Sequence, residues 1–325
     1  TFPGRRGGGL HFRQRRDAVS MKAVVYTEYG SPEVLQLKEV PTPVPRDDQI
    51  LIRIHAASLN RSDWEGLTGS PAYARMGGLF RPGNPILGSD IAGRVEAIGK
   101  THTRFRPGDE VYGDIMESPG GFAEYVCVRG TTLLPKPGWM SFEQAAAIPQ
   151  AAVIALQGVR GRGRVQPGEK VLINGAGGGS GMFAIQLAKL SGAVVTAVDN
   201  GGKLDFMRTL GADHVIDYTR EDFTTSGQQY DLILDMVAHR SPFAYARALR
   251  PNGRSYAAGG LVRTFLKILL AGPVIALSAR KRVRVLVAMP NRADIAAMAE
   301  LCEAGTIKLV IDRVFSLRDV PEALR

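Results

Sequence analysis

The order of apolar and polar residues divides the chain into two parts with different periods. From Met21 onward, short runs with a period of two are separated by turn residues, as where Ile52 and Ile54 flank Arg53. These runs predict strands at residues 23–26, 34–40, 49–57 and 120–128, with another beginning at residue 111. The first part of the chain is therefore predicted to be a mostly antiparallel β domain.

The period changes near Ser141, which is placed to cap a helix. An alanine-rich helical segment follows at residues 145–158, interrupted at Pro149. Strand-like and helical segments then alternate. Strands are predicted at residues 170–174, 194–198, 214–218, 230–237 and 253–260, and helices at 182–190, 203–210 and 241–249. This alternation predicts an α/β domain with a doubly wound parallel sheet. Nearer the end, residues 294–304 read as a helix and 311–317 as a strand.

A glycine-rich turn follows the first strand of the second part. It has the spacing Gly175-x-x-Gly178-x-x-Gly181 rather than the common G-x-G-x-x-G. Such a turn lets backbone N–H groups and the positive end of the next helix face a dinucleotide pyrophosphate, although glycines also serve plain turn geometry. We predict cofactor binding by six residues of this turn: Gly175, Ala176, Gly178, Gly179, Ser180 and Gly181.

Asp199 ends the second predicted strand, about 20 residues after the glycines. A carboxylate at this place is expected to bond the ribose hydroxyls of NAD and to repel the 2′-phosphate of NADP. Together with the turn, Asp199 makes a nicotinamide cofactor the expected ligand and a redox enzyme the working hypothesis.

Composition narrows the class of protein. A length of 325 residues suits two domains, since domains of about 100–150 residues are typical. Two cysteines, Cys127 and Cys302, are too few for a disulfide framework or a four-cysteine zinc site, and they favour a reducing, cytoplasmic setting. The net charge of +10 permits a nucleic-acid partner, but no array of basic and aromatic residues that would stack bases is visible.

Residues 1–20 form a basic leader or an upstream extension before Met21. They hold five arginines and one aspartate, a net charge of +4, and no apolar run of the kind found in a secretory signal. An arginine-rich, acid-poor segment is also typical of a transit peptide. The rest of the positive charge is expected to be spread over the chain.

The longest uncharged apolar segment lies between Lys267 and Arg280. Gly272-Pro273 interrupts it, and it is shorter than the roughly 20 residues that span a bilayer. No membrane contact is therefore expected. The side chains Leu266, Ile268, Leu269 and Leu270 are predicted to pack at a subunit or domain interface, or over a substrate cleft.

From Met21 to its end, the chain resembles the medium-chain dehydrogenase/reductase superfamily, in particular its zinc-free quinone oxidoreductase branch. The stretches that carry the resemblance are residues 21–26, 56–63, 87–93, 121–126, 172–181 and 210–218. It implies a GroES-like β-rich catalytic domain at residues 21–149 and 289–325. A Rossmann dinucleotide-binding domain is implied at residues 150–288, with the active cleft between the two and a homodimer formed through Rossmann sheet edges.

The resemblance also bears on metal. Zinc-dependent members of the superfamily hold catalytic zinc with a Cys and a His-Glu pair. Asn60 stands here in place of that Cys, and Ser89-Asp90 in place of the pair. Asparagine and serine are poor zinc ligands, so no metal site is expected.

Without a metal, hydride transfer from a reduced nicotinamide to a quinone or an α,β-unsaturated carbonyl is the expected chemistry. Asn60 resembles the family asparagine near the nicotinamide and the acceptor, although asparagine is also a common turn residue. Tyr73 lies near the region where related enoyl reductases carry a tyrosine acid, but its register differs. Water is the alternative proton source.

The choice between NADPH and NADH stays open at this point. Lys203 and Tyr218 match family positions that contact the NADPH phosphate, whereas Asp199 favours NADH. Gly259 resembles a residue near the nicotinamide. Two other functions remain as alternatives: an alcohol dehydrogenase of the same superfamily, or a non-catalytic protein on this fold that binds nucleic acid or acts like a crystallin.

Family members also end with a strand after the final helix, whereas residues 321–325 read as part of that helix. The resemblance therefore implies that a strand closing the β domain is lacking, with lower stability as the expected consequence.

Overall fold

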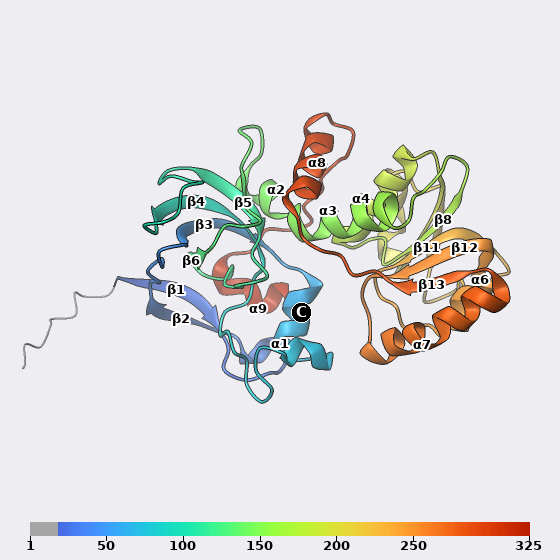
Figure 1. The fold of residues 1–325 in the computed structure, drawn as a ribbon, viewed down its shortest axis with the longest axis horizontal. Coiled ribbons are helices and arrows are strands. Elements are labelled where there is room, and N and C mark those ends of the chain that lie inside the picture. Colours follow the sequence, from blue (N-terminus) through green and yellow to red (C-terminus); the bar gives the residue numbers. More distant parts are fainter. Residues whose placement is uncertain (1–18) are drawn as a thin grey trace, which may run out of the picture.

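The computed structural model describes residues 19–325, which form two lobes side by side (Figure 1). The β-rich lobe holds β1 (Ser20–Val25) to β7 (Leu134–Pro135), and the second lobe holds β8 (Lys170–Asn174) to β13 (Arg282–Val285). This mixed α/β architecture confirms the predicted fold class. The exact domain boundaries stay a prediction, and the predicted leader falls almost wholly outside the described residues.

The β-rich lobe contains a five-stranded antiparallel sheet in the order β6-β3-β4-β5-β7. Its long strands are β3 (Ile50–Ser58), β4 (Asp90–Ile98) and β5 (Glu110–Asp114), and its two edges are β6 (Tyr125–Val128) and β7. The period-two pattern has the predicted effect, because Ile50 and Ile52 are fully buried against Val95 and Val111. Beside this sheet, β1 pairs with β2 (Gln36–Pro41), and α1 (Arg61–Thr68) follows β3.

The second lobe is built on a six-stranded parallel sheet in the order β10-β9-β8-β11-β12-β13. Its remaining strands are β9 (Val194–Asp199), β10 (His214–Asp217), β11 (Tyr230–Asp235) and β12 (Leu249–Ala257). From β8 the chain adds strands first toward one edge of the sheet, as β9 and β10, and then toward the other edge, as β11 to β13. Ligands of open α/β sheets bind at the carboxyl ends of the strands where this order switches, here between β8 and β11. The turn after β8 is therefore at the expected place for a cofactor.

Helices cover both faces of this sheet (Figure 1). They are α3 (Pro149–Leu156), α4 (Gly179–Leu190), α5 (Leu204–Thr209), α6 (Pro242–Ala248) and α7 (Val262–Ala279). Helix α8 (Arg292–Glu303) packs on α3 instead of on the sheet. The break predicted at Pro149 is confirmed, since α2 (Phe142–Ala146) ends before it and α3 begins at it. Ser141 caps α2 by accepting a 3.2 Å hydrogen bond from the N–H of Gln144.

One predicted strand is wrong. Residues 311–317 are extended but pair with no strand of the described chain, so they have no ladder of backbone hydrogen bonds. Their apolar side chains are not buried in a sheet, because Ile311 and Val314 are exposed. The segment runs instead along the space between the lobes, where its side chains form a wall.

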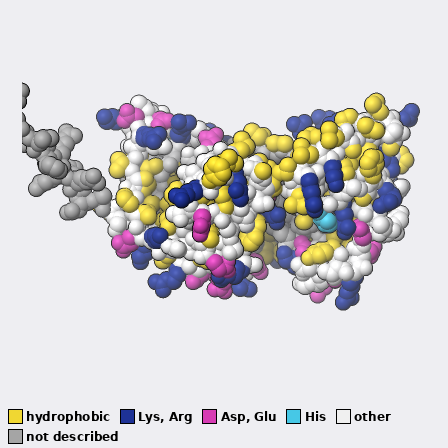
Figure 2. Space-filling model, turned by 90° about the horizontal axis from the view of Figure 1, so that it is seen from below, with side chains coloured by type: hydrophobic (Ala, Val, Ile, Leu, Met, Phe, Trp, Pro, Cys, Tyr) yellow, Lys and Arg dark blue, Asp and Glu magenta, His cyan; other side chains and the backbone are white. Residues whose placement is uncertain are grey.

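The predicted interruption at Gly272-Pro273 is also wrong, because α7 continues through it for 18 residues. Pro273 is exposed, and Gly272 packs so closely on β13 that an added Cβ would lie 2.6 Å from the carbonyl oxygen of Val283. Of the four side chains predicted to pack, only Ile268 is buried, while Leu266, Leu269 and Leu270 are exposed. Apolar side chains accordingly gather with basic ones on the surface of this lobe (Figure 2).

The boundary between α6 and β12 differs from the prediction as well. β12 begins at Leu249, four residues before the predicted start, because Leu249 is fully buried and pairs with Tyr230 of β11. The strand ends at Ala257, which leaves Gly259 in the turn after it.

Candidate functional site

A cleft of 1160 Å³ lies between the two lobes, and a second cavity of 540 Å³ adjoins it. Both are lined by Leu59 and Asn60 from the β-rich lobe and by Gly178 and Gly179 from the glycine turn. The combined space is large enough for a dinucleotide and a small acceptor, since pockets for drug-sized ligands measure about 300–1000 Å³. It lies where the strand order of the parallel sheet switches.

The glycine turn needs glycine at two of its positions for different reasons. Gly175 has φ +76°, a left-handed conformation that favours glycine. At Gly181 an added Cβ would lie 2.4 Å from the carbonyl oxygen of Gly175 and 2.5 Å from the Ala176 backbone, so α4 packs directly on the turn. The N–H groups of the first turn of α4, with Gly178 at its N-cap, are thereby aimed at the cavities and suited to an anion.

Asp199 and Lys203 both lie beside the glycine turn. This is the position that Asp199 needs for its predicted contact with the ribose hydroxyls. Oδ2 of Asp199 accepts a 2.9 Å hydrogen bond from the N–H of Gly177, and Oδ1 accepts one of 2.8 Å from the N–H of Asn200. The stem of Lys203 covers Gly177 so closely that an added Cβ there would lie 2.5 Å from Cδ of the lysine. The structure therefore brings Gly177, Asp199 and Lys203 together at one end of the site.

Most of the predicted cofactor residues line the two cavities. The smaller cavity is lined by Gly175, Gly178, Gly179, Ser180, Gly181, Asp199 and Gly259, and the larger one by Gly178, Gly179 and Lys203. Two predicted residues do not line either cavity. Ala176 is fully buried, and Tyr218 is a half-exposed side chain beyond the end of β10. Cofactor contact by any of these residues stays a prediction.

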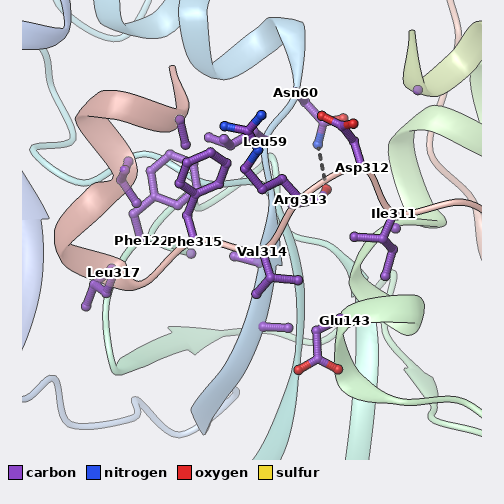
Figure 3. A pocket seen from close by; sticks show the side chains of 18 of the residues that line it. Leu59, Asn60, Phe122, Glu143, Ile311, Asp312, Arg313, Val314, Phe315 and Leu317 are labelled. Carbon is purple, nitrogen blue, oxygen red and sulfur yellow. Dashed lines mark hydrogen bonds between the residues drawn. The ribbon is translucent and has the colours of Figure 1, made fainter. Parts of the chain in front are cut away.

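Asn60 lies at the N-cap of α1, in the wall shared by both cavities (Figure 3). Its backbone N–H donates to Oδ2 of Asp63 at 2.8 Å. Its side-chain nitrogen donates to Ser58 Oγ at 3.3 Å and to Oδ2 of Asp90 at 3.1 Å. The two N–H bonds of the amide are used by the protein, and its oxygen takes part in the capping box of α1 toward the N–H of Asp63. An amide oxygen has two lone pairs, so the second is left to accept a hydrogen bond from a ligand.

Three carboxyl groups lie beneath Asn60: Asp63 of α1, Asp90 of β4 and Asp114 of β5. Burial raises the pKa of Asp63 to about 7, against the hydrogen bonds from Asn60 and Gly88. Burial, and then repulsion from Asp114, raise the pKa of Asp90 well above its usual value, and burial also raises the pKa of Asp114. Oδ1 of Asp90 has no hydrogen-bond partner among the described residues. The floor of the site therefore favours a neutral, protonated carboxyl beside Asn60.

Tyr73 lies in the same small cavity as Asn60 and Gly259. Its hydroxyl donates to Oε2 of Glu65 at 2.8 Å. Burial raises the pKa of the Tyr73 phenol, and the hydrogen bond to the Glu65 carboxylate raises it further. Such a phenol is a weaker acid than a free tyrosine. The position of Tyr73 in the cavity supports its predicted role as proton donor, whereas the raised pKa of its phenol opposes that role.

Two further parts of the site have no signal in the sequence. Gln150 donates its N–H to Oδ2 of Asp90 at 2.8 Å and its side chain accepts from Ser62, which ties α3 to the floor of the site. The segment at residues 310–318 forms one wall of the larger cleft. In the view of Figure 3, the Asp312 carboxylate is drawn beside Asn60 and the Arg313 side chain extends toward Leu59. The apolar pattern of this segment predicts a strand and gives no sign of a cleft wall.

The residues present do not fit a zinc ion. No group of three or more His, Cys, Asp or Glu side chains able to hold a metal is found in residues 19–325. At the place of the family's zinc ligands the chain offers the neutral side-chain amide of Asn60, whose nitrogen is bonded to Asp90, and a buried carboxyl with a raised pKa. Catalytic zinc is instead bound by three deprotonated His, Cys or carboxylate ligands.

Family models match both lobes. A model described as an alcohol dehydrogenase GroES-like domain matches residues 46–138, and one described as a zinc-binding dehydrogenase matches residues 210–325.

Similar proteins and structures cover most of the chain. A chloroplastic quinone-oxidoreductase of Triphysaria versicolor is 30% identical over 320 residues, which are 93% of this chain and 93% of that protein. A 2-methylene-furan-3-one reductase of Solanum lycopersicum is 38% identical over 230 residues, which cover 67% of this chain and 57% of the tomato protein. The structure of the quinone oxidoreductase from Coxiella burnetii has 31% identity, a TM-score of 0.81 and 94% coverage of both chains.

Proposed function

Since the chain belongs to the medium-chain dehydrogenase/reductase superfamily, in its quinone-oxidoreductase-like branch, we propose that it is an NAD(P)H-dependent reductase of quinones or α,β-unsaturated carbonyls. The observation that carries the proposal is the glycine turn, whose N–H groups and Asn60 face one shared cavity at the switch point of the parallel sheet. The turn and Asn60 would hold a reduced nicotinamide, which would supply a hydride for the acceptor carbon, with the electron pair passing to the acceptor oxygen and a proton completing the reduction.

The protein's contribution is to position the reactants. The turn from Gly175 to Gly181 holds the pyrophosphate, and the carbonyl oxygen of Asn60 orients a donor group of the cofactor. Asp90 and Gln150 act through Asn60 as positioning residues. Tyr73 is one candidate for the proton donor, and water admitted through the open cleft is the other.

We propose NADPH as the preferred cofactor. The Asp199 carboxylate, which by itself favours NADH, already accepts hydrogen bonds from Gly177 and Asn200, and the Lys203 side chain lies next to it. A cation at this place favours a 2′-phosphate. An NADPH-dependent alkenal/one oxidoreductase of Arabidopsis thaliana, 35% identical over 230 residues and covered over 57% of its length, supports this choice.

We propose that the reaction needs no zinc. The support is the chemistry of the side chains beneath the cleft, since an amide and a buried acid stand where zinc ligands would be required. An alcohol dehydrogenase reaction, the alternative within the superfamily, is disfavoured for the same reason.

The remaining proposals concern the protein's surroundings. We propose a homodimer that forms through β13, because this strand is at an edge of the parallel sheet and its outer backbone groups pair with no strand of the described chain.

We also propose a cytoplasmic location and no nucleic-acid partner. Cys127 and Cys302 are both free, and burial raises the pKa of each thiol to about 11, so neither is reactive.

The proposed function is tested by following the oxidation of NADPH and of NADH against a panel of quinones and enones with a strong chelator present. Oxidation of NADPH by at least one acceptor, unchanged by the chelator, is expected. If neither cofactor is oxidised by any acceptor, the reductase is rejected. Oxidation of alcohols that is lost in the chelator would favour the zinc alcohol dehydrogenase instead.

A further inference from the structure

The positive charge of this chain is concentrated in one stretch and is not spread evenly as expected. Residues 236–293 contain eleven Lys and Arg residues and no Asp or Glu. They comprise α6, β12, α7 and β13, which lie together at the outer end of the parallel sheet (Figure 1). This flank of the protein therefore supplies no carboxylate of its own to balance its basic residues.

Helix α7 crosses this flank with apolar side chains on both its inner and outer sides. The inner stripe contains Ile268 and Ile275, which are fully buried against Val283 of β13. The outer side carries large apolar side chains that are more than half exposed, and we call them the α7 face. They are Leu266, Leu269, Leu270, Val274 and Leu277. The exposed fraction reaches 78% at Leu270 and 87% at Leu277, so nothing in the described chain covers this face.

Basic residues border the α7 face. Arg263 and Lys267 are exposed on the helix itself, and Arg280 ends it in a left-handed conformation with φ 52°. None of these three forms a salt bridge with a described residue. Within residues 236–293, the arginines that do form salt bridges are Arg240 with Asp222, Arg250 with Asp231 and Arg254 with Glu169.

The sequence predicts no membrane contact, but the exposed apolar side chains and basic border of α7 favour one. We propose that the α7 face docks on the surface of an anionic phospholipid membrane. A helix with outward leucines and flanking Lys or Arg has the composition of helices that lie in the membrane interface. There the leucines enter the acyl boundary while the basic side chains meet lipid phosphates. By length and composition alone, this helix of 18 residues is long and apolar enough to cross a membrane. However, its inner stripe is packed on β13, so it can lie on a membrane without unfolding the sheet but cannot cross one.

The positive charge around the α7 face favours an anionic membrane over a second copy of the chain as its binding partner. A symmetric contact through the α7 face would bring the same basic residues into one interface twice, and residues 236–293 would supply no carboxylate to pair with them. An anionic lipid surface provides the missing negative charge.

Docking would also place the membrane beside the site. Helix α7 begins at Val262, three residues after Gly259, and Gly259 lines the smaller cavity. An apolar acceptor dissolved in the bilayer would then have a short path to the cleft. This last consequence rests on the proposed function, whereas docking itself does not.

The test is sedimentation of the full chain with vesicles, either of phosphatidylcholine alone or of an equal mixture of phosphatidylcholine and phosphatidylglycerol. Binding to the mixed vesicles is expected, with little binding to neutral ones and weaker binding at high salt. The double variant Leu270→Gln, Leu277→Gln should lower the association constant at least tenfold, because each leucine that enters the acyl region contributes strongly. Arg263→Gln and Lys267→Gln should each lower it about fivefold.

The matched control is Val44→Gln, which makes an equally exposed apolar side chain polar on the other lobe. It should bind vesicles as the unchanged protein does. NADPH oxidation without vesicles and the thermal midpoint confirm that every variant is folded, and they report on the proposed function separately. No binding to mixed vesicles, or equal loss in Val44→Gln, overturns the proposal. Dimers that dissociate in the leucine variant, without vesicle binding, would assign the α7 face to a second copy.

Discussion

The side-chain nitrogen of Asn60 donates a 3.1 Å hydrogen bond to Oδ2 of Asp90, and this bond decides which end of the Asn60 amide faces the cleft. Asp90 is fully buried, and the N–H of Gln150 reaches the same oxygen at 2.8 Å. Asn60 therefore presents an acceptor to the cofactor side of the site, and the acid beneath it controls that orientation.

Replacing this acid should impair the site through Asn60. Asp90→Ala removes the acceptor of two N–H donors, so we expect kcat/KM for NADPH oxidation to fall by about tenfold to a hundredfold. Asp90→Asn keeps the shape and one acceptor oxygen, and it should retain more activity than Asp90→Ala. Steady-state rates of both variants check this. Equal rates for Asp90→Ala and the unchanged protein would show that Asp90 does not position Asn60.

The same residue predicts how stability depends on pH. Burial and Asp114 raise the pKa of Asp90 in the folded protein above its unfolded value of about 4. The folded state thus binds the proton more tightly, and the stability from this group is full at low pH and declines as pH rises above about 4. Asp90→Asn has no such dependence. Denaturant unfolding at several pH values should show the unchanged protein losing stability relative to Asp90→Asn as pH rises, and the opposite trend would contradict the account.

Replacing Gly181 or Gly178 of the turn by alanine should have different effects on the protein. Gly181→Ala places Cβ 2.4 Å from the carbonyl oxygen of Gly175, so the helix must move and the protein should lose about 1–3 kcal/mol of stability. At Gly178 the nearest atom is 3.4 Å away, and Gly178→Ala should fold normally. Its methyl group enters both cavities, however, and should weaken NADPH binding. Thermal unfolding and fluorescence titration with NADPH separate the two effects, and normal stability of Gly181→Ala would be a contrary result.

Cofactor preference should depend on Lys203. Lys203→Ala removes the cation beside Asp199, and we expect KM for NADPH to rise about fivefold to thirtyfold while KM for NADH changes little. Arg208→Ala is a matched control, because Arg208 is a basic residue of the neighbouring helix that pairs with the exposed Asp205. An equal change in KM for both cofactors would mean that Lys203 holds the helix end and no 2′-phosphate.

A partly buried ion pair should contribute to stability only where its acid is ionised. Arg254 of β12 binds Glu169 through two hydrogen bonds of 2.8 and 2.6 Å. Burial opposes ionisation of Glu169, but the bonds from Arg254 and the Gln166 N–H outweigh it and lower the pKa. This stability is therefore present above about pH 4 and is lost as pH falls below it.

The variant Glu169→Gln isolates that contribution. At neutral pH it should reduce the free energy of unfolding by about 1–3 kcal/mol, and the difference should shrink in acid. Asp205→Asn, at an almost fully exposed pair, should leave the thermal midpoint nearly unchanged. A Glu169→Gln deficit that grows below pH 4 would contradict the sign of the shift.

The sequence predicted those parts of the protein in which local pattern and global fold agree. The alternation in residues 49–57 and the glycine spacing after residue 174 each specify a local conformation that the structure contains. The segment at residues 311–317 was misread because an apolar pattern predicts an extended chain but does not specify a partner strand. The continuity of α7 was missed because Gly272 and Pro273 break helices by local propensity, whereas packing on β13 overrides it here.

The floor of the site was beyond local reasoning for a different reason. Asp63, Asp90 and Asp114 come from one helix and two strands, and only the fold brings them beneath Asn60. A single aspartate in a sequence is most often a solvated surface residue. The raised pKa values follow from burial, and burial of these carboxyl groups is a property of the tertiary structure.

The central claim is that the cleft transfers hydride from a nicotinamide to an unsaturated acceptor. It is tested most directly with NADPH that carries deuterium at the transferred position of the nicotinamide ring and an enone that proves to be a substrate. Mass spectrometry and NMR of the product should find deuterium at the β-carbon of the enone, with the α-hydrogen taken from solvent. Product that carries no deuterium at the β-carbon, or that takes its β-hydrogen from water, would contradict the account.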